Sequence, residues 1–464
     1  MATPVLAQNG AGSADPVTKG QDTTRRDEKG REKEKERRQA DEGTETTARR
    51  PYRAVYGGAS KRIDLRRTLD FNGAITENYD QDRLAEASSP ESSRLVDSGG
   101  FYSGLVGDLV FDRKGNRLEA NVSGGANARY YPDLNRFLAS DYHAGAGLSA
   151  RVTRRTDVRV NQAFSFAPVD LLGIFVTAVP PALGEGLPVS TDYAVNDNRS
   201  YANSTSAQIS RRMSPRGDLA FNGSLKLTRF LADRSGNNKF RELGGGGVYT
   251  YRLNTGANLR LGYGYRDAQY QGTSTSSANP AEHTLDIGID LHRTLSDSRR
   301  TSFTLKTGSA LLEAPTPANL LVSTRQLRVL IDGSVAHQMG ETWQLVGSYR
   351  RGSDIVEGLA GPIFSDAWTV STNGFLARRA DFTSALSYST GEPSLATASQ
   401  NFTTYTGNAR LRVGLSQRWA TTAEYLHYFY DFSKTPQLAQ GFNPRFSRNL
   451  FRVGLSLWVP FGRH

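Results

Sequence analysis

Apolar residues alternate with polar or small residues over most of this chain, from about residue 66 to the C-terminus. The segment 451–461 shows the pattern most clearly, because its odd-numbered positions are all apolar: Phe451, Val453, Leu455, Leu457, Val459 and Phe461. Between the first five lie Arg452, Gly454, Ser456 and Trp458. A period of two places successive side chains on opposite faces of a β-strand. The sequence therefore predicts long strands with one apolar face and one polar face.

The connections between these strands alternate between short and long. Short polar turns are expected at 113–116, 153–156, 211–217, 252–256, 293–300, 338–341, 377–381 and 416–418. Longer polar, glycine-rich or proline-rich loops are expected at 79–100, 131–141, 167–198, 231–240, 268–282, 313–324, 351–363, 390–401 and 431–447. These eight short turns and nine long loops join eighteen strands. The count falls to sixteen if the weak first strand, around Leu69 to Ile75, and one partner do not form.

Alternating short turns and long loops are typical of an outer-membrane β-barrel, which has an even number of antiparallel strands. A lipid bilayer offers no hydrogen bonds to backbone groups, so a sheet that crosses it must close on itself. A soluble propeller also has a regular repeat, but it packs four short strands into each unit rather than two long ones. We therefore predict an all-β fold, a transmembrane antiparallel up-and-down barrel spanning residues 66–464.

Residues 1–60 form a separate region with a different composition. Residues 25–38 are almost unbroken mixed charge, and the region holds few aliphatic or aromatic residues. Such a segment buries too little apolar surface to offset its chain entropy, so we expect a disordered tail on the periplasmic side. A helix braced by i,i+4 charge pairs is the alternative for 27–38. Residues 1–8 resemble the end of a signal peptide, and a chance alanine-rich start is the alternative.

Composition excludes several classes of protein. Only 37% of the residues are hydrophobic and the mean hydropathy is −0.51, so the sequence does not predict a bundle of membrane-spanning helices. The absence of cysteine excludes disulfides and thiolate metal sites. The net charge of +11 is common in nucleic-acid-binding proteins. However, many arginines sit in pairs at the turns, away from aromatic residues, so we do not expect a nucleic acid as partner.

The sequence holds no motif that predicts an enzyme. The six histidines form no H-E-x-x-H pattern, and neither a G-x-S-x-G elbow nor a phosphate-binding P-loop is present. The glycines at 145 and 147 fit a loose dinucleotide pattern, but they lie in an alternating strand with no helix after it. We therefore expect no catalytic residues, no cofactor and no metal site.

The last strand resembles the C-terminal signal by which outer-membrane barrels are recognised for assembly. A polar residue, a glycine and spaced hydrophobic residues carry this likeness: Arg452, Gly454, Leu457 and Val459. Such signals usually end on an aromatic residue, whereas here Pro460, Phe461 and three further residues follow. With the repeated strand–turn pattern, residues 66–464 resemble porin-like barrels that are often encoded beside exopolysaccharide-export genes. The resemblance implies the outer-membrane lipid, the barrel-assembly machinery and exopolysaccharide-export components as partners.

If the aliphatic faces contact lipid, the opposite faces line the interior. On this register the interior candidates are Arg151, Arg159, Lys226, Arg260, Lys306, Arg328, Arg410, Arg412, Arg452, Asp286 and Asp290. A polar, charged interior suits water and hydrophilic solutes, and the basic excess predicts a mild preference for anions. The alternative is that these charges pair between neighbouring strands and brace the wall.

The third long loop, at 167–198, is unusually apolar before the two prolines at 180 and 181. Its apolar residues are Leu171, Leu172, Ile174, Phe175, Val176 and Val179. In the porins that the chain resembles, the loop at this position folds into the lumen and narrows it. The resemblance therefore implies that 170–183 forms a constriction, and a loop packed on its neighbours is the alternative. As a constriction, its deletion should raise single-channel conductance.

Together these patterns predict an outer-membrane channel that passes hydrophilic solutes or a polymer. A barrel that does not transport, and instead has a structural or partner-binding role, is the second hypothesis.

Overall fold

The computed structural model describes twelve segments of the chain. They are 67–81, 99–133, 137–168, 199–231, 237–272, 281–295, 300–313, 325–340, 342–355, 362–393, 401–431 and 445–463. The charged tail at 1–60 and the apolar segment at 170–183 lie outside these residues. All described residues belong to one compact unit, which spans Arg50–His464.

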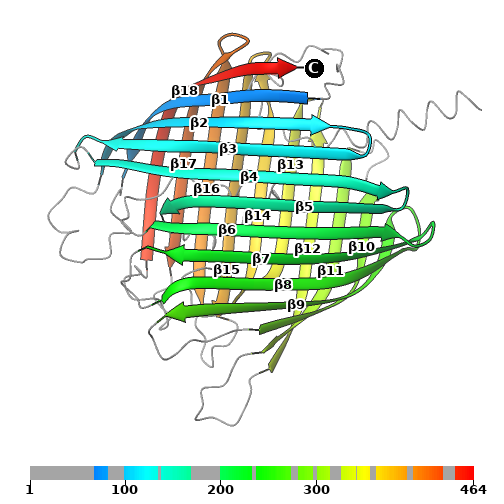
Figure 1. The fold of residues 1–464 in the computed structure, drawn as a ribbon. Coiled ribbons are helices and arrows are strands. Elements are labelled where there is room, and N and C mark those ends of the chain that lie inside the picture. Colours follow the sequence, from blue (N-terminus) through cyan, green and yellow to red (C-terminus); the bar gives the residue numbers. More distant parts are fainter. Residues whose placement is uncertain are drawn as a thin grey trace, which may run out of the picture. The chain divides into compact units, whose positions relative to one another are not determined.

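Eighteen β-strands make up the described structure, as the alternating sequence predicts (Figure 1). Their bounds are β1 (Arg67–Asp80), β2 (Gly100–Lys114), β3 (Leu118–Tyr131), β4 (Phe137–Thr153), β5 (Thr156–Pro168), β6 (Arg199–Arg212), β7 (Gly217–Phe230), β8 (Asn237–Arg252), β9 (Ala257–Gly272), β10 (Ala281–Thr294), β11 (Thr301–Glu313), β12 (Arg325–Met339), β13 (Trp343–Ile355), β14 (Pro362–Ala377), β15 (Ala380–Pro393), β16 (Phe402–Gly414), β17 (Trp419–Asp431) and β18 (Arg445–Arg463). No helix of the described residues has the length and apolar character needed to cross a bilayer.

The sheet closes on itself. Each strand pairs antiparallel with the strand before it and the strand after it, from β1–β2 through β17–β18. The last strand, β18, pairs with β1 from Thr68 opposite Arg463 to Asp80 opposite Leu450. Closure gives the backbone groups of the first and last strands a partner, and it confirms the predicted up-and-down barrel.

Connections at one end of the barrel are short and those at the other end are mostly longer. The short ones follow β2, β4, β6, β8, β10, β12, β14 and β16, at the predicted turns. In the turn after β12, Gly340 has a φ of 67°, a conformation that glycine adopts without steric cost. We call this end of the barrel the short-turn end and the opposite end the long-connection end.

Several strands extend further toward the long-connection end than the sequence predicts. The loop expected at 131–141 shrinks because β4 begins at Phe137, and the loop expected at 431–447 ends where β18 begins at Arg445. Two charged residues lie close to these strand ends: Asp141 within the loop expected at 131–141, and Arg448 just after the one expected at 431–447. The structure pairs both residues with charges on neighbouring strands, so they fit within the sheet.

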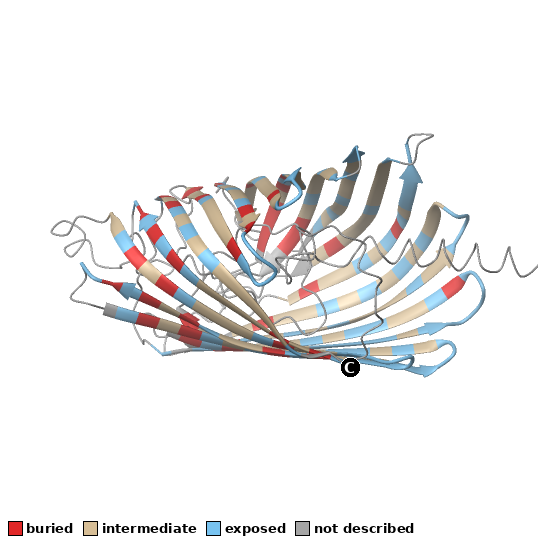
Figure 2. Cartoon of the chain, turned by 90° about the horizontal axis from the view of Figure 1, so that it is seen from above, coloured by how far each residue is buried: buried red, intermediate tan, exposed pale blue. Residues whose placement is uncertain are grey.

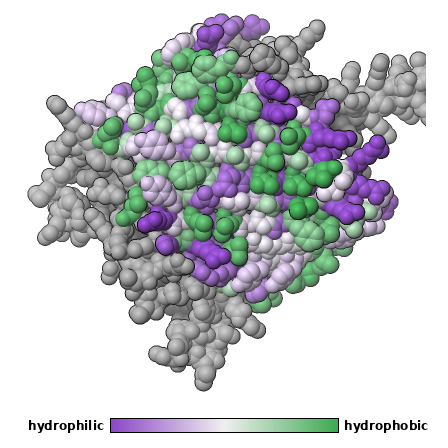
Figure 3. Space-filling view, in the orientation of Figure 1, coloured by the Kyte–Doolittle hydropathy of each residue, from purple (hydrophilic) through white to green (hydrophobic). Residues whose placement is uncertain are grey.

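The two faces of the wall differ in exposure, as the alternation predicts. Residues of the apolar face are largely exposed, for example Leu327 at 70%, Ile75 at 60% and Ile287 at 55%. Figure 2 shows exposed positions alternating with buried or intermediate ones along the strands. Figure 3 shows apolar residues over the strands and hydrophilic residues toward the right edge, where β2 ends. We call the apolar, exposed face the outward face and the opposite face the inward face.

Candidate functional site: the inward face of the barrel

The charged residues that the sequence assigned to the interior all alternate with the exposed apolar positions. The structure therefore places them on the inward face: Arg151, Arg159, Lys226, Arg260, Lys306, Arg328, Arg410, Arg412, Arg452, Asp286 and Asp290. Their role as a channel lining stays a prediction.

Arg260 on β9 lies at the centre of one cluster. Its Nε donates to Asp286 at 2.7 Å, its Nη1 donates to Asp290, and its Nη2 donates to the carbonyl of Thr307 at 2.8 Å. The sequence predicted that Arg260 and both aspartates face inward, but it did not predict that their side chains contact one another. Two carboxylates and one guanidinium leave a net negative charge at this point.

The Arg260 cluster sits where the β10–β11 pairing is interrupted. The register is regular at Leu285 opposite Ser309 and again at Leu291 opposite Leu305. Between these points β10 has more residues than β11, so the strand bulges. The bulge frees the carbonyl of Thr307 for Arg260, and it brings Asp286 and Asp290 to the same guanidinium.

A second cluster surrounds Arg266, which was not among the residues predicted to line the interior. Its guanidinium contacts Glu282 on β10 and lies 3.7 Å from Glu242 on β8. It also donates to the carbonyl of Ser353 on β13 at 3.2 Å, and the Ser353 hydroxyl donates to Glu282 at 3.4 Å. Arg266, like Arg260, occupies an even-numbered position of the same strand, so the alternation of the sequence already indicated that it faces inward. The contact with β13 was not visible in the sequence.

A hollow of about 490 Å³ opens between these clusters on the inward face of β7–β13. Its cationic lining includes Arg260, Arg266, Lys306 and Arg350, and its acidic lining includes Glu282, Asp286 and Asp332. Glycines at 244, 246, 264 and 308 leave room within it. The lining offers hydrogen bonds and charges of both signs to water and hydrophilic solutes. Among the described residues, no group of His, Asp or Glu is arranged to hold a metal ion.

Four other predicted arginines pair with carboxylates. Arg412 binds Asp381, Arg452 binds Glu424 at 3.1 Å, and Arg151 lies 3.4 Å from Asp157. Arg328 on β12 binds Glu392 on β15 and lies over the Phe364 ring at 5.0 Å. These contacts support the hypothesis that part of the inward charge braces the wall.

Two buried ion pairs lie on the inward face at the long-connection end, and the carboxylate of each pair falls in a segment where the sequence predicted a loop. Arg448 on β18 donates to both oxygens of Asp80 on β1, and both side chains are at most 2% exposed. Arg129 on β3 lies 3.3 Å from Asp141 on β4, with similar burial. Asn127 also donates to Asp141, at 3.2 Å.

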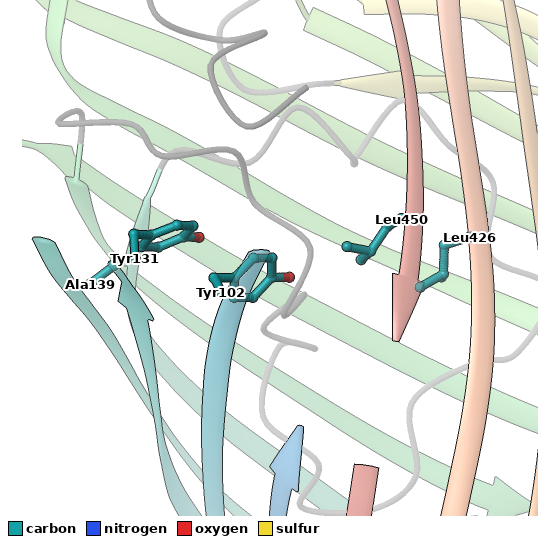
Figure 4. Packing of buried hydrophobic residues seen from close by; sticks show 5 residues of the cluster. All are labelled: Tyr102, Tyr131, Ala139, Leu426 and Leu450. Carbon is teal, nitrogen blue, oxygen red and sulfur yellow. The ribbon is translucent and has the colours of Figure 1, made fainter. Parts of the chain in front are cut away.

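An apolar cluster lies at the same end. The rings of Tyr102 and Tyr131 stack with centroids 4.9 Å apart, beside Ala139. Figure 4 shows these residues on the first strands of the barrel, with Leu426 and Leu450 together on the last two. All five are buried. Among the described residues, buried inward side chains are more numerous at this end than at the short-turn end, where Asp381 and Arg412 are buried but Arg151 is 62% exposed.

Aromatic side chains form two belts on the outward face. Neighbouring rings lie within 5.1 Å of each other near the long-connection end in the pairs Tyr79–Phe101, Phe166–Tyr201, Tyr265–His283, Tyr349–Trp368 and Tyr388–Tyr405. Toward the short-turn end, Phe71 lies near Phe461 and Trp343 near Phe382. Aromatic belts of this kind mark the two interfaces between a bilayer and water.

The predicted constriction lies outside the described residues, as do its candidates Leu171, Leu172, Ile174, Phe175 and Val176. The residues of the assembly signal, Arg452, Gly454, Leu457 and Val459, all lie on β18 beside the closing strand β1. Their recognition by the assembly machinery stays a prediction.

No protein-family model matches the sequence, and no curated protein matches it. Solved structures of similar topology include OccAB3 of Acinetobacter baumannii, with a TM-score of 0.41, 11% identity, and coverage of 85% of this chain and 99% of that one. OccK2 (OpdF) of Pseudomonas aeruginosa in complex with glucuronate has a TM-score of 0.43 and 10% identity, and the match covers 85% of this chain and 98% of that one. A BenF-like porin from Pseudomonas fluorescens Pf-5 has a TM-score of 0.44 and 10% identity, and the match covers 85% of this chain and 99% of that one.

Proposed function

We propose that this chain is an outer-membrane channel that passes hydrophilic solutes across the bilayer. The observation that carries the proposal is the closed barrel, whose outward face is apolar and bounded by aromatic belts while its inward face is charged. A barrel of eighteen strands encloses an aqueous channel unless another element fills it. The inward charges and the hollow on β7–β13 then provide the wall along which solutes pass.

The ion pairs of the described inward face do not add to the predicted anion preference. Arg151, Arg328, Arg412 and Arg452 are matched by single carboxylates, and Arg260 is outnumbered by two. Any selectivity for anions therefore rests on cations outside these pairs, such as Lys306 in the hollow.

The location follows from the same proposal. We place the short-turn end in the periplasm and the long connections outside the cell, as in other outer-membrane barrels. Strand β1 begins and β18 ends at the short-turn end, so the proposal places both of these strand ends on the periplasmic side. A periplasmic tail at 1–60 stays an expectation from the sequence. A link to exopolysaccharide export stays an expectation drawn from the resemblance of the sequence.

One observation favours the second candidate, a barrel that does not transport. The inward residues Arg129, Asp141, Asp80 and Arg448 are almost completely buried at the long-connection end. An interior that is filled across its whole section would block ions, and the barrel would then serve a structural or binding role.

Planar-bilayer recordings of the refolded full-length chain separate the two candidates. A channel gives discrete conductance steps, and a salt gradient gives a reversal potential displaced modestly toward anions. Heat-modifiable migration on a denaturing gel provides the control that the barrel is folded. Folded barrels that insert without conductance would contradict the channel and support the structural role.

A further inference from the structure

Charge is distributed unequally between the two faces of the wall at the short-turn end. In this half of the described strands, every carboxylate lies on the inward face, among them Asp112, Asp157 and Asp218. The charged residues on the outward face of the same half are all cations, and they include Arg67 and Arg113. An acid on the outward face would neutralise them, and the described strands supply none there.

Arg67 and Arg113 continue the columns of apolar residues that face outward. On β1 the column runs through Ile75, which is 60% exposed, toward Arg67. On β2 it runs through Leu105 and Leu109, which are 57% and 46% exposed, toward Arg113. If the apolar stretch spans the hydrocarbon core of a bilayer, as the proposed function requires, its charged end lies at the level of the lipid headgroups.

The two arginines stand directly opposite each other. The β1–β2 register pairs Arg67 with Arg113, and both side chains are exposed. Directly opposed residues have Cβ atoms about 4.5–5.5 Å apart, and like charges at that distance are destabilising. Within the described part of the chain, neither guanidinium has a carboxylate to relieve this repulsion. An anion bound between them would relieve it.

We propose that Arg67 and Arg113 together bind the phosphate headgroup of a phospholipid in the leaflet at the short-turn end. The planar guanidinium presents a fork of N–H donors that fits phosphate oxygens in a bidentate manner. Two forks on adjacent strands provide donors to one phosphate from both sides. The apolar columns above them would contact the acyl chains of the same lipid. The site rests on the proposed membrane location of the barrel.

Native mass spectrometry of barrels extracted from vesicles tests this site. The full-length chain is refolded into phosphatidylcholine vesicles that contain phosphatidylglycerol, and the lipid retained on the barrel after mild detergent extraction is identified. We expect the wild type to retain phosphatidylglycerol and the double variant R67Q/R113Q to bind it about tenfold more weakly, because two charge-assisted contacts are lost. The variant R67K/R113K should bind with intermediate affinity, since it keeps the charge and loses the fork.

The matched control is R151Q/R159Q, which removes the same charge from the inward face at the same end. It should retain phosphatidylglycerol as the wild type does. Equal retention by R67Q/R113Q and the wild type would overturn the site, as would an equal loss in the inward control. A wild-type barrel that folds in detergent but never inserts into vesicles would refute the membrane location itself, which is a different failure. Heat-modifiability of each variant excludes misfolding as the cause.

Discussion

Individual ion pairs on the inward face differ mainly in how far water reaches them. Arg448 and Asp80 are 2% and 1% exposed, whereas Arg151 and Asp157 are 62% and 57% exposed. Water screens the exposed pair, so its net contribution to stability is small. Removing one member of the buried pair leaves an uncompensated charge out of water, which is costly.

Replacing Arg448 with alanine should therefore destabilise the barrel far more than replacing Arg151. We expect R448A to lower the free energy of unfolding by about 3–5 kcal/mol, because Asp80 stays buried without its partner. The matched variant R151A should change it by no more than about 1 kcal/mol. Urea unfolding of the refolded barrel, followed by heat-modifiable migration, measures both. Similar effects of the two substitutions would show that burial does not set the strength of these pairs.

The sequence predicted which residues face inward better than it predicted their partners. Strict alternation is a local property, so Arg260, Arg328 and Arg412 could be placed from their neighbours in the chain. The contact between Arg328 on β12 and Glu392 on β15 joins strands that are not adjacent, and no local pattern reports it. Asp80 and Asp141 were assigned to loops because charged residues at the ends of strands resemble polar loop residues in the sequence.

At the scale of strands, the regular wall is disturbed between β12 and β14. Pairing of β12 with β13 runs from Met339 opposite Trp343 only as far as Ile331 opposite Arg351. Beyond this point β13 remains paired with β14, up to Ile355 opposite Pro362. The strands thus separate at the long-connection end, and there Ser353 contacts Arg266 and Glu282 instead. We infer that this part of β13 and β14 leans into the interior.

The first residues of β14 show the same displacement through their burial. Phe364 and Trp368 share one side of the strand by alternation, yet Phe364 is 3% exposed and Trp368 is 55% exposed. The inward-facing Arg328 and the guanidinium of Arg351 both lie over the Phe364 ring, at 5.0 and 5.3 Å. Regular alternation in an undisturbed wall would expose both aromatic side chains, and the separation of β12 from β13 explains why only Trp368 is exposed.

Single-cysteine variants at these two positions test the displacement, since the chain contains no native cysteine. A spin label at W368C should be readily accessible to oxygen dissolved in the bilayer, while a label at F364C should be several-fold less accessible. Alternation places both sites on the same side of the same strand, so each serves as the control for the other. Equal accessibility in lipid vesicles would mean that β14 stays in a regular wall.

At the scale of the whole described barrel, the number of strands and their direction followed from the sequence because both depend on a repeated pattern. The spacing of the short turns set eighteen strands, and the structure places each turn at one end. The shape of the interior could not be predicted in this way. It depends on cross-strand contacts such as Tyr102 with Tyr131, whose rings meet from β2 and β3 and fill one end.

This unequal filling predicts that a conducting barrel has two different mouths. Most buried inward side chains lie at the long-connection end, as Asp141 and Tyr131 do. Asp381 and Arg412 are buried at the short-turn end, but Arg151 and Asp157 there are exposed. A neutral polymer that enters a channel displaces ions and lowers its conductance, so polymer size reports the width of the mouth it enters.

Polyethylene glycols of intermediate size should lower the conductance of oriented single channels when added on the short-turn side. The same polymers should have little effect from the other side, because the filled end excludes them. The smallest polymers, which enter both mouths, provide the control for channel integrity. Equal size cut-offs from both sides would place the narrowest section midway along the barrel and contradict the asymmetry.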